Sequence, residues 1–348
     1  MDGYAVRSCD IDRASTKHPV SLRLMGEIHA GSPLCFRVEK ECAVRVSTGS
    51  RIPPGTDAVV MQEDCRVEGN TVFVQALESR WGNIRRKGEE IRKHQIALPK
   101  GTVLQPGSLA WLATMGIRQV SVYHRPKVGL LRSGTEVVDW GQSPRAYQIR
   151  DAHGVSLPLA LQQMGFDVQM PAIVGDNLSL VTRAYGKLLS SCDLLITTGG
   201  VSVGDRDLFH AAARAHHVTT IFHKVSQKPG KPMAFGKRGS KIWFGLPGNP
   251  VASLVCFYLY IRPALLKMMG HPHPSSTWFE VKTAESYRSN PRRTEFLRGF
   301  LEKGRVTFAE KQGSHCLGSF AQTNVLIQLP PSHRIGKVGN RVLCMWLS

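Results

Sequence analysis

The chain has 348 residues, of which 42% are hydrophobic and 20% are charged, so it can bury several cores and is expected to form two to four domains. This composition excludes an intrinsically disordered chain. The formal net charge of +19 favours polyanionic ligands in general. The basic residues are dispersed, however, and neither an RNA-binding aromatic signature nor a zinc-finger spacing is present, so nucleic acid is not the expected partner.

The eight cysteines form neither a CxxC pair nor a compact framework, and no signal peptide precedes them. This pattern indicates reduced thiols in the cytoplasm. The longest apolar run, 251–261, has only eleven residues, whereas a membrane span needs about 20. We therefore expect a buried helix there and no membrane partner. Cys192 and Cys256 lie within apolar stretches and are expected to be buried and unreactive.

The first eighty residues are expected to be rich in β-structure. Residues 42–49 alternate between apolar and polar side chains, and a Gly-Asn turn separates two strand-like runs within 66–74. A polar, glycine-punctuated stretch follows at 82–93. The spacing of apolar residues then predicts a helix at 106–116, and the chain is expected to return to a strand at 118–127.

From about residue 126 to 270 strands and helices alternate, which predicts a largely parallel, doubly wound sheet. Asn249 and Pro250 are expected to cap and begin the last of these helices. The expected strands are 127–134, 166–176, 193–200 and 241–248, and the expected helices are 153–165, 177–191 and 251–269. In the second helix, one face is expected to hold Leu178, Val181, Tyr185 and Leu188.

After a linker rich in proline and serine at 270–276, short strands separated by polar turns predict a small β-barrel. His271 and His273 lie in this linker. Two histidines can chelate a metal, but we expect this pair to be exposed linker residues.

Two of the predicted strands end in glycine-rich loops, 197–207 and 244–253. Because ligands bind at the carboxyl ends of strands in a parallel α/β sheet, both loops are expected to line one site. Glycine lets the backbone approach a ligand and point N–H groups at an anion, and the following helix adds the positive end of its dipole. Hydroxyl donors are available at Thr197 and Thr198. The residues expected to hold a phosphate-bearing ligand are Gly199, Gly200, Ser202, Gly204, Pro247, Gly248 and Asn249.

Charged residues accompany these loops. Lys228 and Lys231 lie between them in the sequence and can neutralise phosphate charge. Asp205 and Asp207 repel a phosphate unless a cation such as Mg²⁺ bridges the two, so we expect them to be metal ligands. The alternative is that the glycines serve only the turns and that Asp207 caps a helix. The combination of loops, lysines and aspartates favours the ligand site.

Motifs with a specific order cover the whole chain: MDGYAVR, STGSRIPPGTDAVVMQE, GNIRRKGEEI, SGTEVV, TTGGVSVGDRD, KPGKPMAFG, GLPGNPVAS and QGSHCLGSF. They resemble the molybdopterin molybdenumtransferase family, which includes MoeA and the E domains of gephyrin and its plant counterpart. The resemblance implies a multidomain α/β fold. Its implied parts are a β-rich N-terminal domain at 1–83, an extended dimerising segment at 84–125, a MogA-like doubly wound α/β domain at 126–271 and a C-terminal β-barrel domain at 272–348.

The resemblance also implies an enzyme. Members of the family take adenylyl-molybdopterin and molybdate as small-molecule substrates, remove the adenylyl group hydrolytically and insert the metal into the dithiolene, which gives molybdenum cofactor and AMP. Mg²⁺ is the implied cofactor. The implied protein partners are a second copy of the chain, a MogA-like adenylyltransferase and acceptor molybdoenzymes.

The acidic residues that matter in the family fall on positions of this chain that match its motifs. In the family's dimer, the aspartate of the first motif would face the α/β domain of the other subunit. The implied catalytic residues are Asp2, Glu90, Glu136, Asp176 and Asp207.

The chain departs from the family's pattern at three places. Glu90 stands where the family has an aspartate, so its carboxylate extends about one methylene further. The family's STGDEL turn reads RSGTEV at 132–137, which removes one carboxylate and adds the cation of Arg132. The family's DSN element reads Asp151-Ala152-His153. These changes keep open a second hypothesis, a catalytically weakened molybdopterin-binding scaffold with the same fold.

A third hypothesis is the MogA-type adenylylation of molybdopterin, which uses a similar α/β domain. The flanking β-domains and the MDGYAV motif argue against it. Family members have additional residues before this motif, whereas Met1 is the motif's own methionine. We expect a gene start assigned too late rather than a shortened protein.

Overall fold

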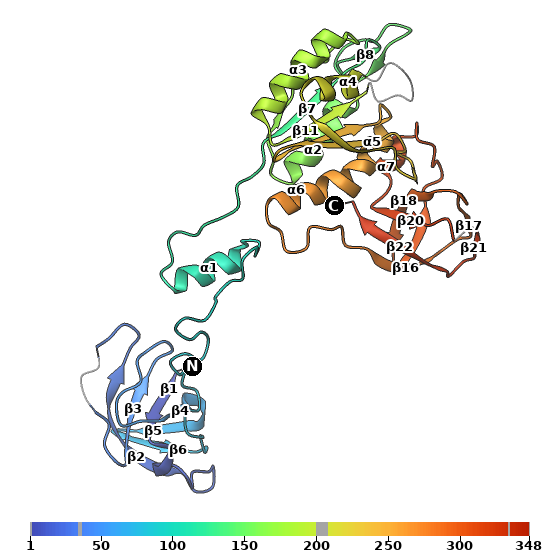
Figure 1. Cartoon of the computed structure of the whole chain (residues 1–348). Coiled ribbons are helices and arrows are strands. Elements are labelled where there is room, and N and C mark those ends of the chain that lie inside the picture. Colours follow the sequence, from blue (N-terminus) through green and yellow to red (C-terminus); the bar gives the residue numbers. More distant parts are fainter. Residues whose placement is uncertain (1, 34–36, 200–207, 333–334, 348) are drawn as a thin grey trace. The chain divides into compact units, whose positions relative to one another are not determined.

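The computed structural model describes residues 2–33, 37–199, 208–332 and 335–347 (Figure 1). The chain separates into two compact units, Met1–Ala97 and Leu98–Ser348, and each is described by itself.

Unit 1 is a six-stranded sheet in the order β4-β1-β3-β2-β6-β5. Alternating apolar side chains fill a core on each face of the sheet, one around Tyr4 and Val6 and the other around Ala5 and Val44. The hairpin predicted within 66–74 is confirmed. The elements are β1 (Gly3–Val6), η1 (Ser8–Asp10), β2 (Val20–Ile28), β3 (Cys42–Val46), β4 (Ala58–Met61), η2 (Gln62–Asp64), β5 (Cys65–Glu68) and β6 (Thr71–Val74).

Unit 2 begins with the helix α1 (Pro106–Thr114), which confirms the helix predicted at 106–116. The strand predicted at 118–127 is wrong, because these residues form no strand. They alternate in polarity, but no strand in the described part of the chain pairs with them, and Val122 and Tyr123 remain exposed. Alternation alone does not make a strand when the backbone finds no partner.

The central sheet of unit 2 has the order β10-β7-β11-β15-β14-β12. β10, β7, β11 and β15 run parallel, whereas β14 pairs antiparallel with both β15 and β12. The bounds are β7 (Val128–Arg132), β10 (Val168–Gln169), β11 (Leu194–Thr198), β12 (Thr219–His223), β14 (Ala234–Arg238) and β15 (Lys241–Leu246).

Helices cover both faces of this sheet, as predicted for a doubly wound fold (Figure 1). One core includes Leu157, Leu254 and Leu265, and the other includes Val181, Phe209 and Trp243. The predicted stripe of the second helix is correct for Val181, Tyr185 and Leu188 but wrong for Leu178, which is exposed at the first turn. The helices are α2 (His153–Gln163), α3 (Leu178–Ser191), α4 (Leu208–Ala215), α5 (Pro250–Cys256), the π-helical η3 (Phe257–Ile261) and α6 (Arg262–Met268).

The last three elements form one continuous helical run, Pro250–Met268. By length and composition this run would suffice for a membrane span, but every residue from Val251 to Phe257 is buried. Its apolar side chains fill the sheet core and contact the barrel, so the prediction of a buried helix at 251–261 is confirmed. Cys192 and Cys256 are also buried, and burial raises the pKa of the Cys256 thiol to about 12.

The C-terminal part is a closed five-stranded barrel in the order β18-β19-β16-β22-β20, with β20 pairing back to β18. This confirms the predicted β-barrel. β13, which belongs to the α/β part of the sequence, adds to the barrel beside β18. The remaining elements are β8 (Val137–Val138), β9 (Ile149–Arg150), β13 (Gln227–Lys228), β16 (Phe279–Thr283), β17 (Tyr287–Arg288), β18 (Thr294–Glu302), β19 (Arg305–Phe308), α7 (Gly318–Ala321), β20 (Val325–Leu329), β21 (Ile335–Gly336) and β22 (Arg341–Trp346).

Candidate functional site

The parallel strands β7, β11 and β15 end together. Thr198, the last residue of β11, lies opposite Arg132 on one side and Leu246 on the other. A Cβ added to Gly248 would lie 3.7 Å from the Cα of Gly199. The prediction that the two glycine-rich loops are neighbours at one sheet edge is therefore confirmed for the described residues. Other predicted site residues lie outside those residues, namely Gly200, Ser202, Gly204, Asp205 and Asp207.

Gly199 is required by the backbone at this edge. Its φ of +83° lies in the left-handed region, and an added Cβ would lie 2.3 Å from the carbonyl oxygen of Ser133. The Ser133 N–H donates to the carbonyl of Thr198 at 3.1 Å, which holds the two turns together. Only glycine combines this conformation with so close an approach of two main chains.

The hydroxyl groups of Thr197 and Thr198 lie at the end of β11 and are both buried. Thr197 is fully buried, and its Oγ1 accepts a hydrogen bond from the Trp243 indole at 3.0 Å. Thr198 is 2% exposed. The Thr197 hydroxyl is thus engaged within the fold, and a ligand contact of either hydroxyl stays a prediction.

Asn249 caps the helical run that follows β15. Its side-chain oxygen accepts hydrogen bonds from the N–H groups of Val251 and Ala252, at 3.1 and 3.4 Å, and Pro250 occupies the first turn. Both predicted roles are confirmed. The run continues to Met268, so its positive end lies at the loop of Pro247, Gly248 and Asn249.

The carboxylates of Glu136 and Asp176 belong to two turns that touch. Ser133 forms a parallel bridge with Val174, and Asp176 Oδ2 accepts from the N–H and hydroxyl of Thr135 at 3.3 and 3.4 Å. Both carboxylates are exposed, so they remain accessible to a ligand. Oxygen donors of this kind suit a hard cation such as Mg²⁺. Among the described residues, no group of three or more His, Cys, Asp or Glu could hold a metal ion.

The two lysines of the KPGKP turn differ in their ion pairs. Lys228 lies in β13, and its Nζ donates to Glu295 Oε1 of the barrel strand β18 at 3.0 Å. Lys231 is exposed and makes no ion pair in the described part of the chain. Gly230 packs against Cys256, about 10 Å along the helical run from Asn249.

The remaining predicted acidic residues lie in unit 1. Asp2 Oδ1 accepts from the N–H and the hydroxyl of Thr48, at 2.7 and 3.0 Å, and these hydrogen bonds lower the pKa of Asp2. Glu90 is exposed in a turn. A joint site with unit 2 stays a prediction for both residues.

Two of the departures from the family's pattern meet in one buried polar network beside the loop. Arg132 Nη1 lies 2.5 Å from Asp151 Oδ2, and Asp151 Oδ1 accepts from the N–H of Gly154 at 2.9 Å. His153 Nε2 lies 3.1 Å from the hydroxyl of Ser253. Burial, opposed by Asp151 and reinforced by Arg132, lowers the pKa of His153 to about 4. The cation that the sequence adds at 132 is therefore matched by a carboxylate.

Arg298 is a candidate site residue that the sequence did not single out. It is fully buried in β18, yet its contacts are neutral oxygens: Ser319 Oγ at 2.9 Å, and the carbonyls of Lys311 and Gly313 at 3.0 and 3.2 Å. Its Nη1 has no partner among the described residues. The loop that covers it borders a pocket of about 550 Å³ lined by Lys311, His315, Cys316 and Ser319. In the sequence, only the neighbouring QGSHCLGSF motif pointed to a site near Arg298.

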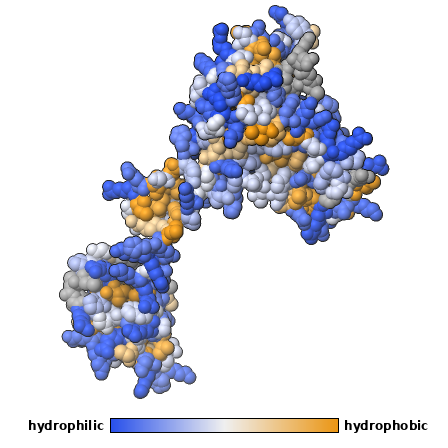
Figure 2. Space-filling view, viewed as in Figure 1, coloured by the Kyte–Doolittle hydropathy of each residue, from blue (hydrophilic) through white to orange (hydrophobic). Residues whose placement is uncertain are grey.

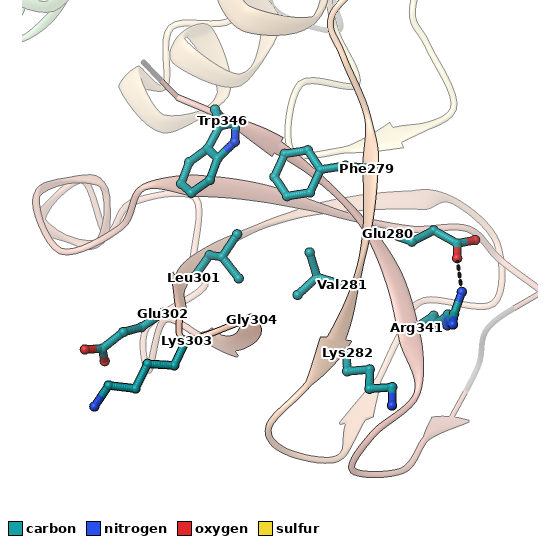
Figure 3. A pocket seen from close by; sticks show the side chains of 10 residues that line it. All are labelled: Phe279, Glu280, Val281, Lys282, Leu301, Glu302, Lys303, Gly304, Arg341 and Trp346. Atoms are coloured by element: carbon teal, nitrogen blue, oxygen red, sulfur yellow. Dashed lines mark hydrogen bonds and ion pairs between the residues drawn. The ribbon is translucent and has the colours of Figure 1, made fainter. Parts of the chain in front are cut away.

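A second pocket, of about 620 Å³, lies on the barrel (Figure 3). Phe279 and Trp346 lie next to one another with ring centroids 5.5 Å apart, and an ion pair of 2.9 Å joins Glu280 to Arg341. None of the predicted site residues lines this pocket.

Taken together, the fold and the strand-end loops define a multidomain α/β protein with glycine-rich loops at one sheet edge and a C-terminal barrel. Residues 1–116 match the MoeA N-terminal region (domains I and II), residues 129–267 match a probable molybdopterin binding domain, and residues 280–346 match the MoeA C-terminal region (domain IV). The chain belongs to the MoeA family.

Relatives cover almost the whole chain. A protein of Haemophilus influenzae named molybdopterin molybdenumtransferase is 37% identical over 94% of this chain and 82% of its own length. A protein of the same name from Nostoc is 33% identical over 100% of this chain and 82% of its own length. The crystal structure of the molybdopterin biosynthesis MoeA protein from Pyrococcus horikoshii superposes with a TM-score of 0.87 at 28% identity, and covers 99% of this chain and 86% of that one.

We expect Gly199→Ala to lower the free energy of unfolding by about 3 kcal/mol or more, because it adds a main-chain clash to an unfavourable φ. Gly239→Ala is a matched control, since Gly239 has a φ of +58° but nothing within 4 Å of an added Cβ. The control should cost about 1 kcal/mol. Urea unfolding measures both, and equal costs would contradict the close approach at Gly199.

The lowered pKa of His153 predicts how the free energy of unfolding depends on pH. Its folded-state pKa of about 4 lies below the ordinary 6.5, so the folded chain binds fewer protons in this window and is destabilised as the pH falls through it. Between pH 7 and about pH 4, the wild type should lose roughly 3 kcal/mol more than His153→Gln. Urea unfolding at several pH values tests this, and parallel losses would show that His153 titrates normally.

Proposed function

We propose that the chain is a molybdopterin molybdenumtransferase, which removes the adenylyl group of adenylyl-molybdopterin and inserts molybdate to give molybdenum cofactor and AMP. The observation that carries the proposal is the meeting of Gly199, Gly248 and the capped helix start at Asn249 at one sheet edge, in a chain of the MoeA family. A phosphate-bearing pterin requires such an anion-binding edge.

In this proposal the loop glycines and the helix start bind the ligand's phosphates, and Lys231 contributes a cation. Glu136 and Asp176, together with Asp2, Glu90 and Asp207, supply carboxylates that orient water. Asp205 and Asp207 would hold Mg²⁺, which supplies charge neutralisation on the phosphates when it is bound. Among the described residues, the exposed carboxylates of Glu136 and Asp176 and the hydroxyl of Thr135 are chemically suited to a hard cation.

Molybdate, a tetrahedral dianion, suits the pocket beside Arg298. The guanidinium of Arg298 is buried and has no carboxylate partner among the described residues, so it carries a large desolvation cost that an anion would offset. Ser319 and the carbonyls that hold Arg298 fix the direction of its remaining N–H groups. We therefore include Arg298 and Ser319 in the oxyanion-binding part of the site.

The proposal includes a homodimer in the cytoplasm. Around α1 the chain exposes apolar side chains that a second copy would cover, among them Leu109, Val120 and Val122, and Figure 2 shows this apolar surface. All seven described cysteines are free thiols, which suits a reducing compartment. A MogA-like adenylyltransferase and acceptor molybdoenzymes are the proposed protein partners.

The deciding experiment incubates the protein with adenylyl-molybdopterin, Mg²⁺ and molybdate, and follows AMP release and reconstitution of a molybdoenzyme. Asp207→Asn should slow AMP release about a hundredfold with unchanged melting, because it removes one catalytic charge. Wild-type release by this variant would instead support a capping role before α4, since asparagine caps as well as aspartate. Ligand binding without AMP release by the wild type would support the scaffold hypothesis.

Arg298→Met should raise the molybdate concentration for half-maximal cofactor formation about a hundredfold, because a buried charged partner of the oxyanion is lost. Arg305→Met removes the same charge from an exposed position of the barrel and should leave this concentration unchanged. Melting temperatures of both variants control for folding. An unchanged molybdate dependence in folded Arg298→Met would exclude Arg298 from the site.

A further inference from the structure

A chain of buried hydrogen bonds connects α2 to the Pro247–Asn249 loop. His153, the first residue of α2, is 9% exposed, and its Nε2 lies 3.1 Å from Ser253 Oγ. Ser253 is fully buried, and its hydroxyl donates to the carbonyl of Pro247 at 2.6 Å. A serine hydroxyl has one hydrogen, so Ser253 must accept from His153. The imidazole therefore carries its proton on Nε2 and acts as a donor.

His153 thus reaches the carbonyl of Pro247 through Ser253. Among the described residues, the backbone N–H groups of Gly248 and Asn249 make no hydrogen bond. These two N–H groups are consequently available to a ligand, and the loop's conformation depends on the contacts of its carbonyl groups.

The position of His153 is itself fixed from β7. Asp151 accepts from Gly154 at the start of α2 and pairs with Arg132 at the end of β7. A Cβ on Gly154 would lie 2.4 Å from Asp151 Oδ2 and 2.5 Å from Arg132 Nη1, so the ion pair lies directly against the glycine. The first turn of α2 cannot shift without disrupting a buried ion pair, which is costly.

We propose that His153 is a positioning residue for the proposed reaction. Through Ser253 it holds the Pro247–Asn249 loop in the conformation that leaves the loop's N–H groups free for the ligand's phosphates. This inference rests on the proposed function for its ligand. The contacts that carry it belong to Arg132 and His153, where the sequence departs from the family's pattern, and to their partners Asp151 and Ser253.

The test measures AMP binding by calorimetry. His153→Phe keeps the ring volume but removes the donor, and Ser253→Ala removes the relay; each should weaken AMP binding about tenfold. The double variant should be no weaker than either single variant, because both remove one chain of hydrogen bonds. His153→Gln keeps a side-chain N–H near the place of Nε2 and should retain AMP binding within about threefold. His216→Phe is a matched control, since His216 bonds to the Thr182 carbonyl elsewhere in the unit and should bind AMP normally.

Nitrogen NMR of the wild type provides a readout independent of activity: His153 should show the neutral Nε2–H form at pH 7. Wild-type AMP binding by folded His153→Phe or Ser253→Ala would overturn the proposal, and if His153→Phe does not fold, Ser253→Ala decides. If the wild type binds AMP but releases none from adenylyl-molybdopterin, the proposed function is wrong. The positioning role is then still decided by AMP binding of His153→Phe and Ser253→Ala. If the wild type binds neither AMP nor pyrophosphate, the positioning role is overturned.

Discussion

The parallel register of β7, β11 and β15 is the constraint on which the candidate site depends. Because Thr198 lies opposite both Arg132 and Leu246, the three strands end within one residue of each other. Their following loops must then begin at the same edge, and the positive φ of Gly199 allows two of them to touch. A one-residue slip of β11 would reverse which of its side chains face each layer, so the apolar cores on both faces hold the register in place.

The two buried arginines of unit 2 are satisfied in different ways. Arg132 has the Asp151 carboxylate, so its charge is neutralised within the fold and it needs no ligand. Arg298 is surrounded by neutral oxygens, and its pKa is lowered because burial disfavours the charged form. A structural role would be served better by a carboxylate neighbour or by an apolar side chain. The persistence of an unmatched cation under a polar loop therefore argues for an anionic ligand at Arg298 and against one at Arg132.

Local features of the site were predictable from the sequence, and long-range ones were not. The Asn249 cap and the glycine turns follow from residues within a few positions of one another, and the strand-helix alternation places them at one edge. His153 and Ser253 are 100 residues apart, and nothing in either segment indicates their contact. The strand predicted at 118–127 is absent for a related reason. Its alternating polarity is a local feature, whereas a strand requires a partner strand that is distant in the sequence.

The pairing of β13 with β18 separates the roles of the two lysines that the sequence had treated alike. Glu295 is 7% exposed, and its second oxygen accepts from the N–H of Asn290 at 2.7 Å. A phosphate that drew Lys228 away would leave this buried carboxylate without its cation, which is costly. Lys231, exposed and without an ion pair in the described structure, carries no such cost. The ion pair with Glu295 fastens Lys228 and its turn to the barrel, whereas Lys231 has no such partner among the described residues, and phosphate binding by both lysines stays a prediction.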